Sequence, residues 1–374
     1  MNEKEISEIR KHYRLDRSSI NHIYGCCIND KKEIISEFDQ SLGSMSEDDA
    51  EGMLSILKKT LSGGRGRNLH EIEFSTEDVM QSEKYKLISD LRTSGLSDAD
   101  LRSKLYAVVA DNLQLDGGYV VLVAHDNYDV FGYTADGEQD TESSTVFSYI
   151  VCAVCPIKSG KPAMSYYMPN KCFRSISADT LIGGVELGFT FPAFDDRSAN
   201  IYGALYYTKN IKDNHPEVAE ALFGKQLPMP AAEQKSTFGE ILEKAVGDEC
   251  KLRVVRSVNA QIKHKTEEHK NEKNEEICRI NKSEAGDMLR YCSVDEDKIE
   301  KFESEFEEVF GKNAELPTSN ISCGKKFEVK TPEVNIKIDS DAADVIETRI
   351  IEGTKYILIR ADNGAVVNGV NVKF

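Results

Sequence analysis

Apolar runs and alternating apolar and polar positions divide the first part of the chain into strands and helices. Residues 119–124 (YVVLVA) and 147–157 (FSYIVCAVCPI) are nearly continuous apolar runs. Runs of this length are typical of strands that are buried on both faces. Residues 20–40 hold two strand-like stretches around the turn residues of 29–32, and therefore predict a hairpin.

Helical spacing marks other segments. Apolar residues after Ser46 repeat at helical spacing until Gly63-Gly64, which predicts a helix with Ser46 at its start. Ser293 and Glu296 have the spacing of a capping box, and the apolar face that follows ends at Gly311. Further helices are expected at residues 78–92, 97–113 and 238–246.

These elements predict an α+β or α/β protein in three parts. Residues 1–235 form a large domain in which a mixed sheet has flanking helices. Residues 236–324 are helical and charged. Residues 325–374 contain short β-forming stretches separated by glycine-containing turns, so they predict a small β-rich unit.

The stretch 186–210 combines six aromatic residues with the charged sequence Asp195-Asp196-Arg197. Charges inside an apolar stretch are paired or functional, because an unpaired buried charge is costly. Two adjacent carboxylates can share a metal ion, and an arginine can bind a phosphate with two hydrogen bonds. The structural alternative, which we prefer, is that Asp196 or Ser198 caps a helix with Ile201, Ala204, Leu205 and Thr208 on its apolar face.

His125, Asp126 and Asp129 follow the apolar run 119–124. If the sheet has parallel portions, ligands gather at the carboxyl ends of its strands. One histidine and two carboxylates could then bind a divalent metal and activate water. The alternative, which we again prefer, is a loop whose aspartates cap turns.

Nine cysteines are present, and their odd number and irregular spacing favour reduced thiols over a disulfide framework. Cys152 and Cys155 form a CxxC pair, with Cys172 as the nearest further thiol. Side chains three residues apart on a strand point to opposite faces, so we expect core residues here and no bound metal or other cofactor.

The formal net charge is −17. An acidic surface repels nucleic acids and anionic membranes over most of its area. One basic segment, residues 251–273, could contact phosphates through Lys251, Arg253, Arg256, Lys263 and Lys265. Its overlap with the charged stretch 263–276 favours a solvated loop, an exposed helix or a linker. The charged N-terminus and the shortness of the apolar runs predict a cytoplasmic protein without membrane insertion.

Several strings, among them HIYGCCIN, VAHDNYDV, FSYIVCAVCPIK and ELGFTFPAFDDRSANIYGALYYTK, resemble the bacterial domain-of-unknown-function family 4317 over nearly the whole chain. This resemblance implies no catalytic residues. The order of a Phe-rich helix, FEVKTPEVNIKID and IETRIIEGTKYILI is similar to the closing segment of the nucleoid-associated protein family.

Three functions remain open. We expect a cytoplasmic, non-catalytic binding or regulatory protein. A metal-dependent hydrolase or phosphoesterase built from His125, Asp126, Asp129, Asp195 and Asp196 is the first alternative, and it requires these side chains to converge. Nucleoid or nucleic-acid association through residues 251–273 is the second.

Overall fold

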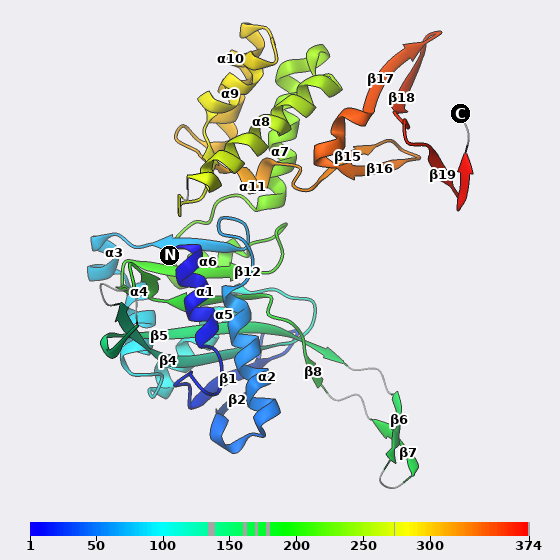
Figure 1. Ribbon diagram of the computed structural model, residues 1–374. Coiled ribbons are helices and arrows are strands. Elements are labelled where there is room, and N and C mark those ends of the chain that lie inside the picture. The colour runs from blue at the N-terminus through cyan, green and yellow to red at the C-terminus, as the bar shows by residue number, and fades with distance from the viewer. Residues whose placement is uncertain (134–138, 160–162, 169–170, 177–179, 273, 373–374) are drawn as a thin grey trace. The chain divides into compact units, whose positions relative to one another are not determined.

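A computed structural model describes residues 1–133, 139–159, 163–168, 171–176, 180–272 and 274–372 (Figure 1). The chain divides into two compact units, Met1–Pro230 and Ala231–Phe374. The first unit combines a large sheet with helices on both of its faces, and the second combines a helical core with hairpins. The fold class is α+β, as the sequence predicts.

The main sheet of the first unit has the strand order β2-β1-β4-β5-β9-β12-β3, with β8 paired to β5. Every pairing among the described strands of this sheet is antiparallel. The expectation of a mixed sheet is therefore wrong, and the argument from carboxyl ends of parallel strands does not apply. The strands are β1 (His22–Ile28), β2 (Ile34–Ser41), β3 (Leu69–Glu73), β4 (Tyr119–Tyr133), β5 (Gln139–Ser159), β8 (Thr180–Ile182), β9 (Leu187–Phe191) and β12 (Gly203–Thr208).

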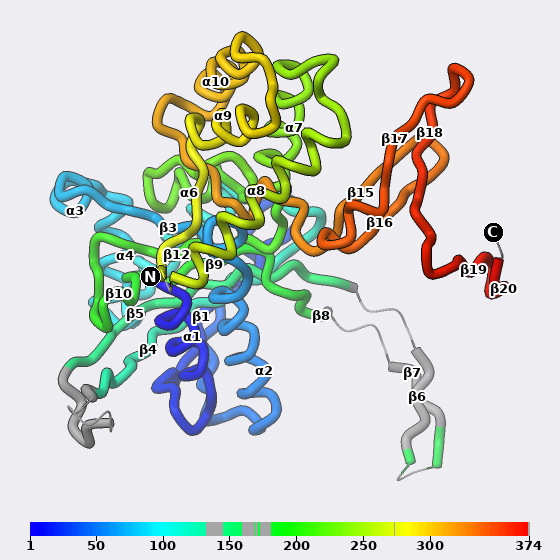
Figure 2. The backbone as a smooth tube through the Cα atoms, turned by 45° about the horizontal axis from the view of Figure 1, so that its top comes forward, coloured from blue at the N-terminus to red at the C-terminus, as the bar shows by residue number. Residues whose placement is uncertain are grey.

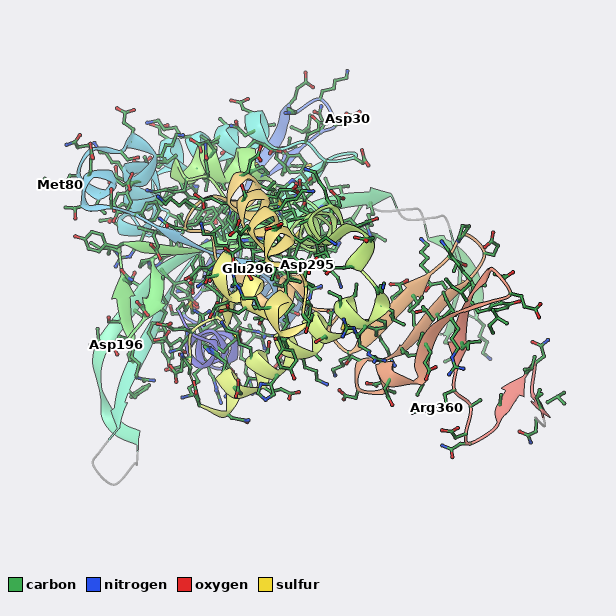
Figure 3. All side chains as sticks on the ribbon, turned by 90° about the horizontal axis from the view of Figure 1, so that it is seen from above. Asp30, Met80, Asp196, Asp295, Glu296 and Arg360 are labelled. Carbon is green, nitrogen blue, oxygen red and sulfur yellow. The ribbon has the colours of Figure 1, made fainter. Side chains whose placement is uncertain are left out.

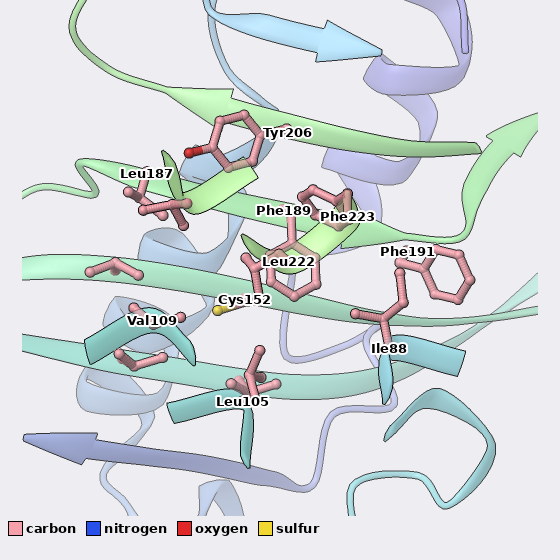
Figure 4. Close-up of a cluster of buried hydrophobic side chains, with 14 of the residues drawn as sticks. Ile88, Leu105, Val109, Cys152, Leu187, Phe189, Phe191, Tyr206, Leu222 and Phe223 are labelled. Carbon is pink, nitrogen blue, oxygen red and sulfur yellow. The ribbon is translucent and has the colours of Figure 1, made fainter. Parts of the chain in front are cut away.

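Helices cover both faces of this sheet, because its central strands are apolar on both sides. On β4, Val121 and Val123 join one core and Leu122 and Ala124 join the other. The first core also receives α4 (Glu83–Thr93), α5 (Ala99–Asn112) and α6 (Pro216–Phe223), and Figure 4 shows part of it. The second core receives α1 (Glu3–His12) and α2 (Glu47–Lys58).

The expected hairpin, the helix after Ser46 and the two apolar strands are confirmed. The expected helix at residues 78–92 is instead divided into α3 (Thr76–Gln81) and α4. Ser82 ends the first helix through its backbone amide, and its hydroxyl accepts a hydrogen bond from the amide of Tyr85 to begin the second. Ser82 thus divides into two helices a stretch whose apolar periodicity predicted one, because serine favours helix starts.

The helix expected around Ile201–Thr208 does not form. Residues 193–195 and 198–200 are the short strands β10 (Ala193–Asp195) and β11 (Ser198–Asn200), which pair with each other, and β12 follows. All six residues of β12 are buried. A continuous apolar run fits a strand buried on both faces as well as a helix, and the β-forming Tyr206 and Tyr207 favour the strand.

The second unit has its own helical core, in which α7 (Ala231–Val246), α8 (Leu252–Asn271), α9 (Lys282–Tyr291) and α10 (Glu296–Phe310) bury apolar faces. Two-residue strands β13 (Arg279–Ile280) and β14 (Leu316–Pro317) pair beside the short helix α11 (Thr318–Ile321). The charged stretch from residue 263 lies in α8 as far as Asn271.

The helix expected after Ser293 is present, but Ser293 does not cap it. Asp295 is the N-cap residue of α10. Ser293 has a φ of 57° and closes the preceding helix α9, since its amide donates to the carbonyl oxygen of Arg290 at 2.9 Å. Two helices follow each other so closely here that the end of one occupies the expected start of the next.

A series of hairpins ends the second unit, and Figure 2 shows them following one another along the chain. They are β15 (Lys326–Lys330) with β16 (Asn335–Asp339), β17 (Ile346–Ile351) with β18 (Thr354–Ile359), and β19 (Ala365–Val367) with β20 (Val370–Val372). The short 3-10 helix η5 (Ser340–Val345) joins the first hairpin to the second. The predicted β-rich end is thus observed.

Among the described residues, no helix is both long and apolar enough to span a membrane.

Candidate functional site

His125, Asp126 and Asp129 lie within strand β4 and not in a loop after it. Strand alternation places His125 and Asp129 on one face of the sheet and Asp126 on the other. Asp126 is fully buried, whereas Asp129 is exposed. The structure therefore places Asp126 on the opposite face from His125 and Asp129, which the hydrolase hypothesis would bring together with it.

Asp126 is surrounded by hydrogen-bond donors. Its Oδ1 accepts from the amide and the hydroxyl of Ser19, both at 2.9 Å, and from the amide of Asn127 at 2.9 Å. Its Oδ2 accepts from the hydroxyls of Ser18 and Tyr149, both at 3.0 Å. A buried carboxylate whose oxygens are both satisfied by the protein is typical of a structural anchor.

The ionisation of this cluster follows from its surroundings. Burial acts to raise the pKa of Asp126, but the nearby His12 imidazole and the donors of Ser19 outweigh that effect and hold this pKa below its usual value. Burial raises the pKa of Tyr149 well above its usual value, so its hydroxyl keeps the proton that it donates to Asp126. His12 Nε2 lies 3.3 Å from Asp126 Oδ2, and both side chains are buried.

His125 has a separate environment on the opposite face. Its Nε2 lies 2.8 Å from the hydroxyl oxygen of Ser148 on β5. Arg92 of α4 donates to the carbonyl oxygen of the same serine at 2.8 Å. Burial lowers the pKa of His125, which favours its neutral form. The Arg92 hydrogen bond joins α4 to the sheet, and the His125 contact links β4 to β5.

Asp196 and Arg197 form the two-residue turn of hairpin β10–β11, and Figure 3 labels Asp196 there. Their φ angles are 47° and 53°, in the left-handed region that two-residue hairpin turns require. The hypothesis of a helix cap at Asp196 is thus wrong. Asp196 is a turn residue instead, and it is exposed.

Arg197 ties this turn to the N-terminal helix. Its Nη1 donates to both carboxylate oxygens of Glu8 on α1, at 3.0 and 2.8 Å, and its Nη2 donates to the carbonyl oxygen of Phe131 on β4 at 2.9 Å. The hydroxyl of Tyr128 also donates to Glu8, at 2.6 Å. Helix α1 therefore contacts both sequence candidates, Asp126 through His12 and Arg197 through Glu8.

Asp195 lines a pocket of about 260 Å³, whose walls also include Glu71, Glu73 and Asn200. The side-chain Nδ2 of Asn200 donates to Asp195 Oδ2 at 3.2 Å. The N-terminal amino group lies 3.7 Å from Asp195 and 3.5 Å from Glu71. This cationic group balances part of the acidic charge at the pocket.

The CxxC pair divides between the two cores. Cys152 belongs to the core beneath α4, α5 and α6, and Cys155 belongs to the core beneath α1 and α2. Burial raises the pKa of both thiols, that of Cys155 to about 12. The predicted opposite orientation is confirmed. Among the residues described, no group of three or more His, Cys, Asp or Glu side chains is arranged to hold a metal ion.

The basic candidates lie on or next to α8. Lys263 pairs with Asp341 and Lys265 pairs with Glu284, so two of the five charges are balanced inside the unit. Arg253 donates to the carbonyl oxygen of Cys292 at 3.3 Å, and Arg256 donates to that of Ala343 at 3.4 Å. Lys251 precedes the helix and is exposed.

Sequence reasoning did not identify a surface on the terminal hairpins. Large apolar side chains there are exposed, including Ile350 at 71%, Val366 at 65% and Val370 at 66%. Strands that lie against a core on one face show alternating apolar and polar residues, but IETRII and AVV break that alternation. The broken alternation was the available signal. We call the exposed apolar residues of β17, β18, β19 and β20 the hairpin surface; they are Ile350, Ile351, Tyr356, Ile359, Val366, Val367, Val370 and Val372.

Comparison with models of known protein families gives a match over nearly the whole chain. A family model described as "Domain of unknown function (DUF4317)" matches residues 1–370. No curated protein matches the chain.

Proposed function

We propose, for a chain that belongs to the DUF4317 family, a cytoplasmic and non-catalytic function in which the hairpin surface binds protein. The first unit serves as a stable body, and the hairpins of the second unit make the contact. The exposure of large apolar side chains on the two-stranded ribbons β17–β18 and β19–β20 carries this proposal.

Isolated two-stranded hairpins are at best marginally stable in water, and exposed edge strands readily pair with another chain. Proteins without a partner at such an edge usually protect it with charges, proline or a covering element. On β19 and β20, Val366, Val367 and Val370 are all more than half exposed. A bound protein would remove this apolar area from water, which favours association.

The candidate catalytic residues support binding over metal-dependent hydrolysis. Asp126 directs both oxygens to donors of its own chain. His125 lies on the opposite face of β4, and Asp196 forms a turn. A hydrolytic metal needs several ligands around a common point, together with an open position for water.

The ion pairs of α8 likewise support protein binding over nucleic-acid association. Lys263 and Lys265 each contact a carboxylate, which reduces the positive charge available to a phosphate backbone. The net charge of −17 opposes the approach of a polyanion.

Site-specific photo-cross-linking in the native cell tests this function. A photoreactive amino acid is placed at Ile350 or at Val366, and at Met80 as the control. Met80 is 77% exposed but lies on the first unit, so it reports random encounters. We expect defined protein adducts from both hairpin positions and none from Met80. Equal labelling at all positions would contradict a binding role for the hairpins, and cell fractionation checks the cytoplasmic location.

A further inference from the structure

The outer edge of strand β17 is available for pairing. In the structure as described, β17 pairs with β18 and with no other strand. All of its residues from Glu347 to Ile351 are exposed, and only Ile346 at its start is buried. Such an edge offers a row of backbone donors and acceptors to a further strand.

The sequence of this strand is complementary to itself. Residues 346–350 read Ile-Glu-Thr-Arg-Ile. If two copies pair antiparallel about a two-fold axis through Thr348, Glu347 of each copy lies opposite Arg349 of the other. Ile346 then lies opposite Ile350, and Thr348 lies opposite itself. The two opposite-charge pairs and the Thr–Thr pair are favourable cross-strand types.

We propose that the hairpin surface binds a second copy of this chain, with β17 paired antiparallel to β17. The occupant is a second copy because two-fold symmetry requires the same patch to complement itself, and residues 346–350 do so. The result is a four-stranded sheet in the order β18-β17-β17-β18. This inference rests on the proposed function and names its partner.

Neighbouring strands lack this complementarity in the register that pairs five residues. A two-fold through the middle of β15 places Glu328 opposite itself and Lys326 opposite Lys330. The corresponding axis of β16 places Lys337 opposite itself. On β18, Lys355 meets no acidic residue in any symmetric register. Charge complementarity thus selects β17 and fixes its register.

The present contacts of the charged residues fit this arrangement. Arg349 Nη2 donates to Glu347 Oε2 at 2.9 Å within the same strand, so both side chains occupy one face of the ribbon. Pairing about Thr348 would bring a second such pair alongside it. Four alternating charges would then lie together on that face, with Tyr356 and Leu358 beside them by register.

Sedimentation velocity of the full chain tests the proposal. We expect the unmodified chain to dimerise as its concentration rises. Arg349→Glu places Glu opposite Glu, and Glu347→Arg places Arg opposite Arg, so each variant alone should have a dissociation constant at least about tenfold higher. Mixing the two variants restores opposite charges at both positions, and this mixture should form a heterodimer. Lys355→Glu on β18 is the matched control and should dimerise like the unmodified chain.

A cross-linking measurement checks the register independently. Under mild oxidation, Thr348→Cys should give a covalent dimer because position 348 lies opposite itself. Ile350→Cys should not, because it lies opposite Ile346 of the other copy. The native cysteines are the same in both variants and provide the background.

The two hypotheses fail differently. If the chain stays monomeric while Ile350 cross-links to another protein, the partner is not a second copy of this chain, but the proposed binding function is still supported. A dimer that neither charge reversal weakens, or that Lys355→Glu weakens equally, would also overturn the pairing of β17. If the chain is monomeric and the hairpin positions give no adducts, both the second copy and the binding function are wrong.

Discussion

His12 Nε2 and Asp126 Oδ2 lie 3.3 Å apart in the interior of the first unit, and this contact fastens the end of helix α1 to strand β4. The carboxylate also holds Ser18 and Ser19 in the connection that leads from α1 towards β1. Asp126 thus organises a chain segment more than 100 positions away in the sequence.

Asp126→Ala should lower the free energy of unfolding by about 3–5 kcal/mol, because it leaves several buried donors without an acceptor. The measurement is chemical denaturation at neutral pH. Asp129→Ala is the control, since Asp129 is exposed, and its effect should stay within about 0.5 kcal/mol. Similar losses from both variants would show that Asp126 has no special structural role.

Acid should weaken the fold partly through His70. This residue of β3 is 4% exposed, and burial lowers its pKa to about 4. The unfolded chain takes up a proton near pH 6.5 while the native chain stays neutral, so stability falls as the pH drops from about 6.5 to about 4. The loss from this group is about 3 kcal/mol at the lower pH.

Denaturation curves of His70→Leu across this pH range test that contribution. The variant should show a shallower decline than the unmodified chain. His264→Gln is the control, because His264 is 72% exposed. The depressed pKa of Asp126 adds a separate loss, which appears as the pH falls through the folded pKa of this carboxyl, below its usual value near 4. If the His70→Leu curve runs parallel to that of the unmodified chain, the histidine is not held neutral.

Asp196 should respond to substitution as a turn residue. Asp196→Val should lower the free energy of unfolding by about 1–2 kcal/mol, because a β-branched residue tolerates a φ of 47° poorly. Asp196→Asn should change it by less than about 0.5 kcal/mol, since asparagine accepts this conformation. Melting temperatures with and without Mg²⁺, Mn²⁺ and Zn²⁺ should agree for both variants. A metal-induced rise that Asp196→Asn abolishes would favour the hydrolase.

Thiol reactivity should follow burial. Cys26, Cys152 and Cys155 are fully buried, and burial raises the pKa of each, so they should resist alkylation in the native chain. The partly exposed thiols should react before them; these are Cys27, Cys172, Cys250 and Cys323. Mass spectrometry after timed alkylation identifies the modified residues. If a chelator accelerated modification of Cys152 and Cys155, the CxxC pair would be a metal site.

The sequence predicts the framework of the first unit well for a physical reason. Strands buried on both faces need continuous apolar runs, and 119–124 and 147–157 supply them. The same signal fails at 201–208, because an apolar run alone does not distinguish a buried strand from a helix. Such runs also do not indicate whether neighbouring strands are parallel or antiparallel. The expectation of a mixed sheet therefore had no local evidence against it.

The candidate site was less predictable because its contacts are distant in the chain. His125 and Asp126 are neighbours in sequence, yet strand alternation sends them to opposite faces. The partners of Asp126 include His12 and Tyr149, and that of Arg197 is Glu8. No local pattern links these residues: the pairing of β4 with β5 places Tyr149 opposite Asp126, and the docking of α1 on the sheet brings His12 and Glu8 to their partners.

The sharing of strands β4 and β5 between two cores has a consequence for how the first unit opens. The loss of either strand would expose apolar residues of both cores at once, whereas the loss of a helix would expose residues of one core only. The amide protons in the buried parts of these two strands, residues 119–124 and 149–155, should therefore exchange with solvent only through global unfolding, whereas those of α1 should exchange through smaller local openings. The centre of the sheet thereby couples the two faces into one cooperative transition.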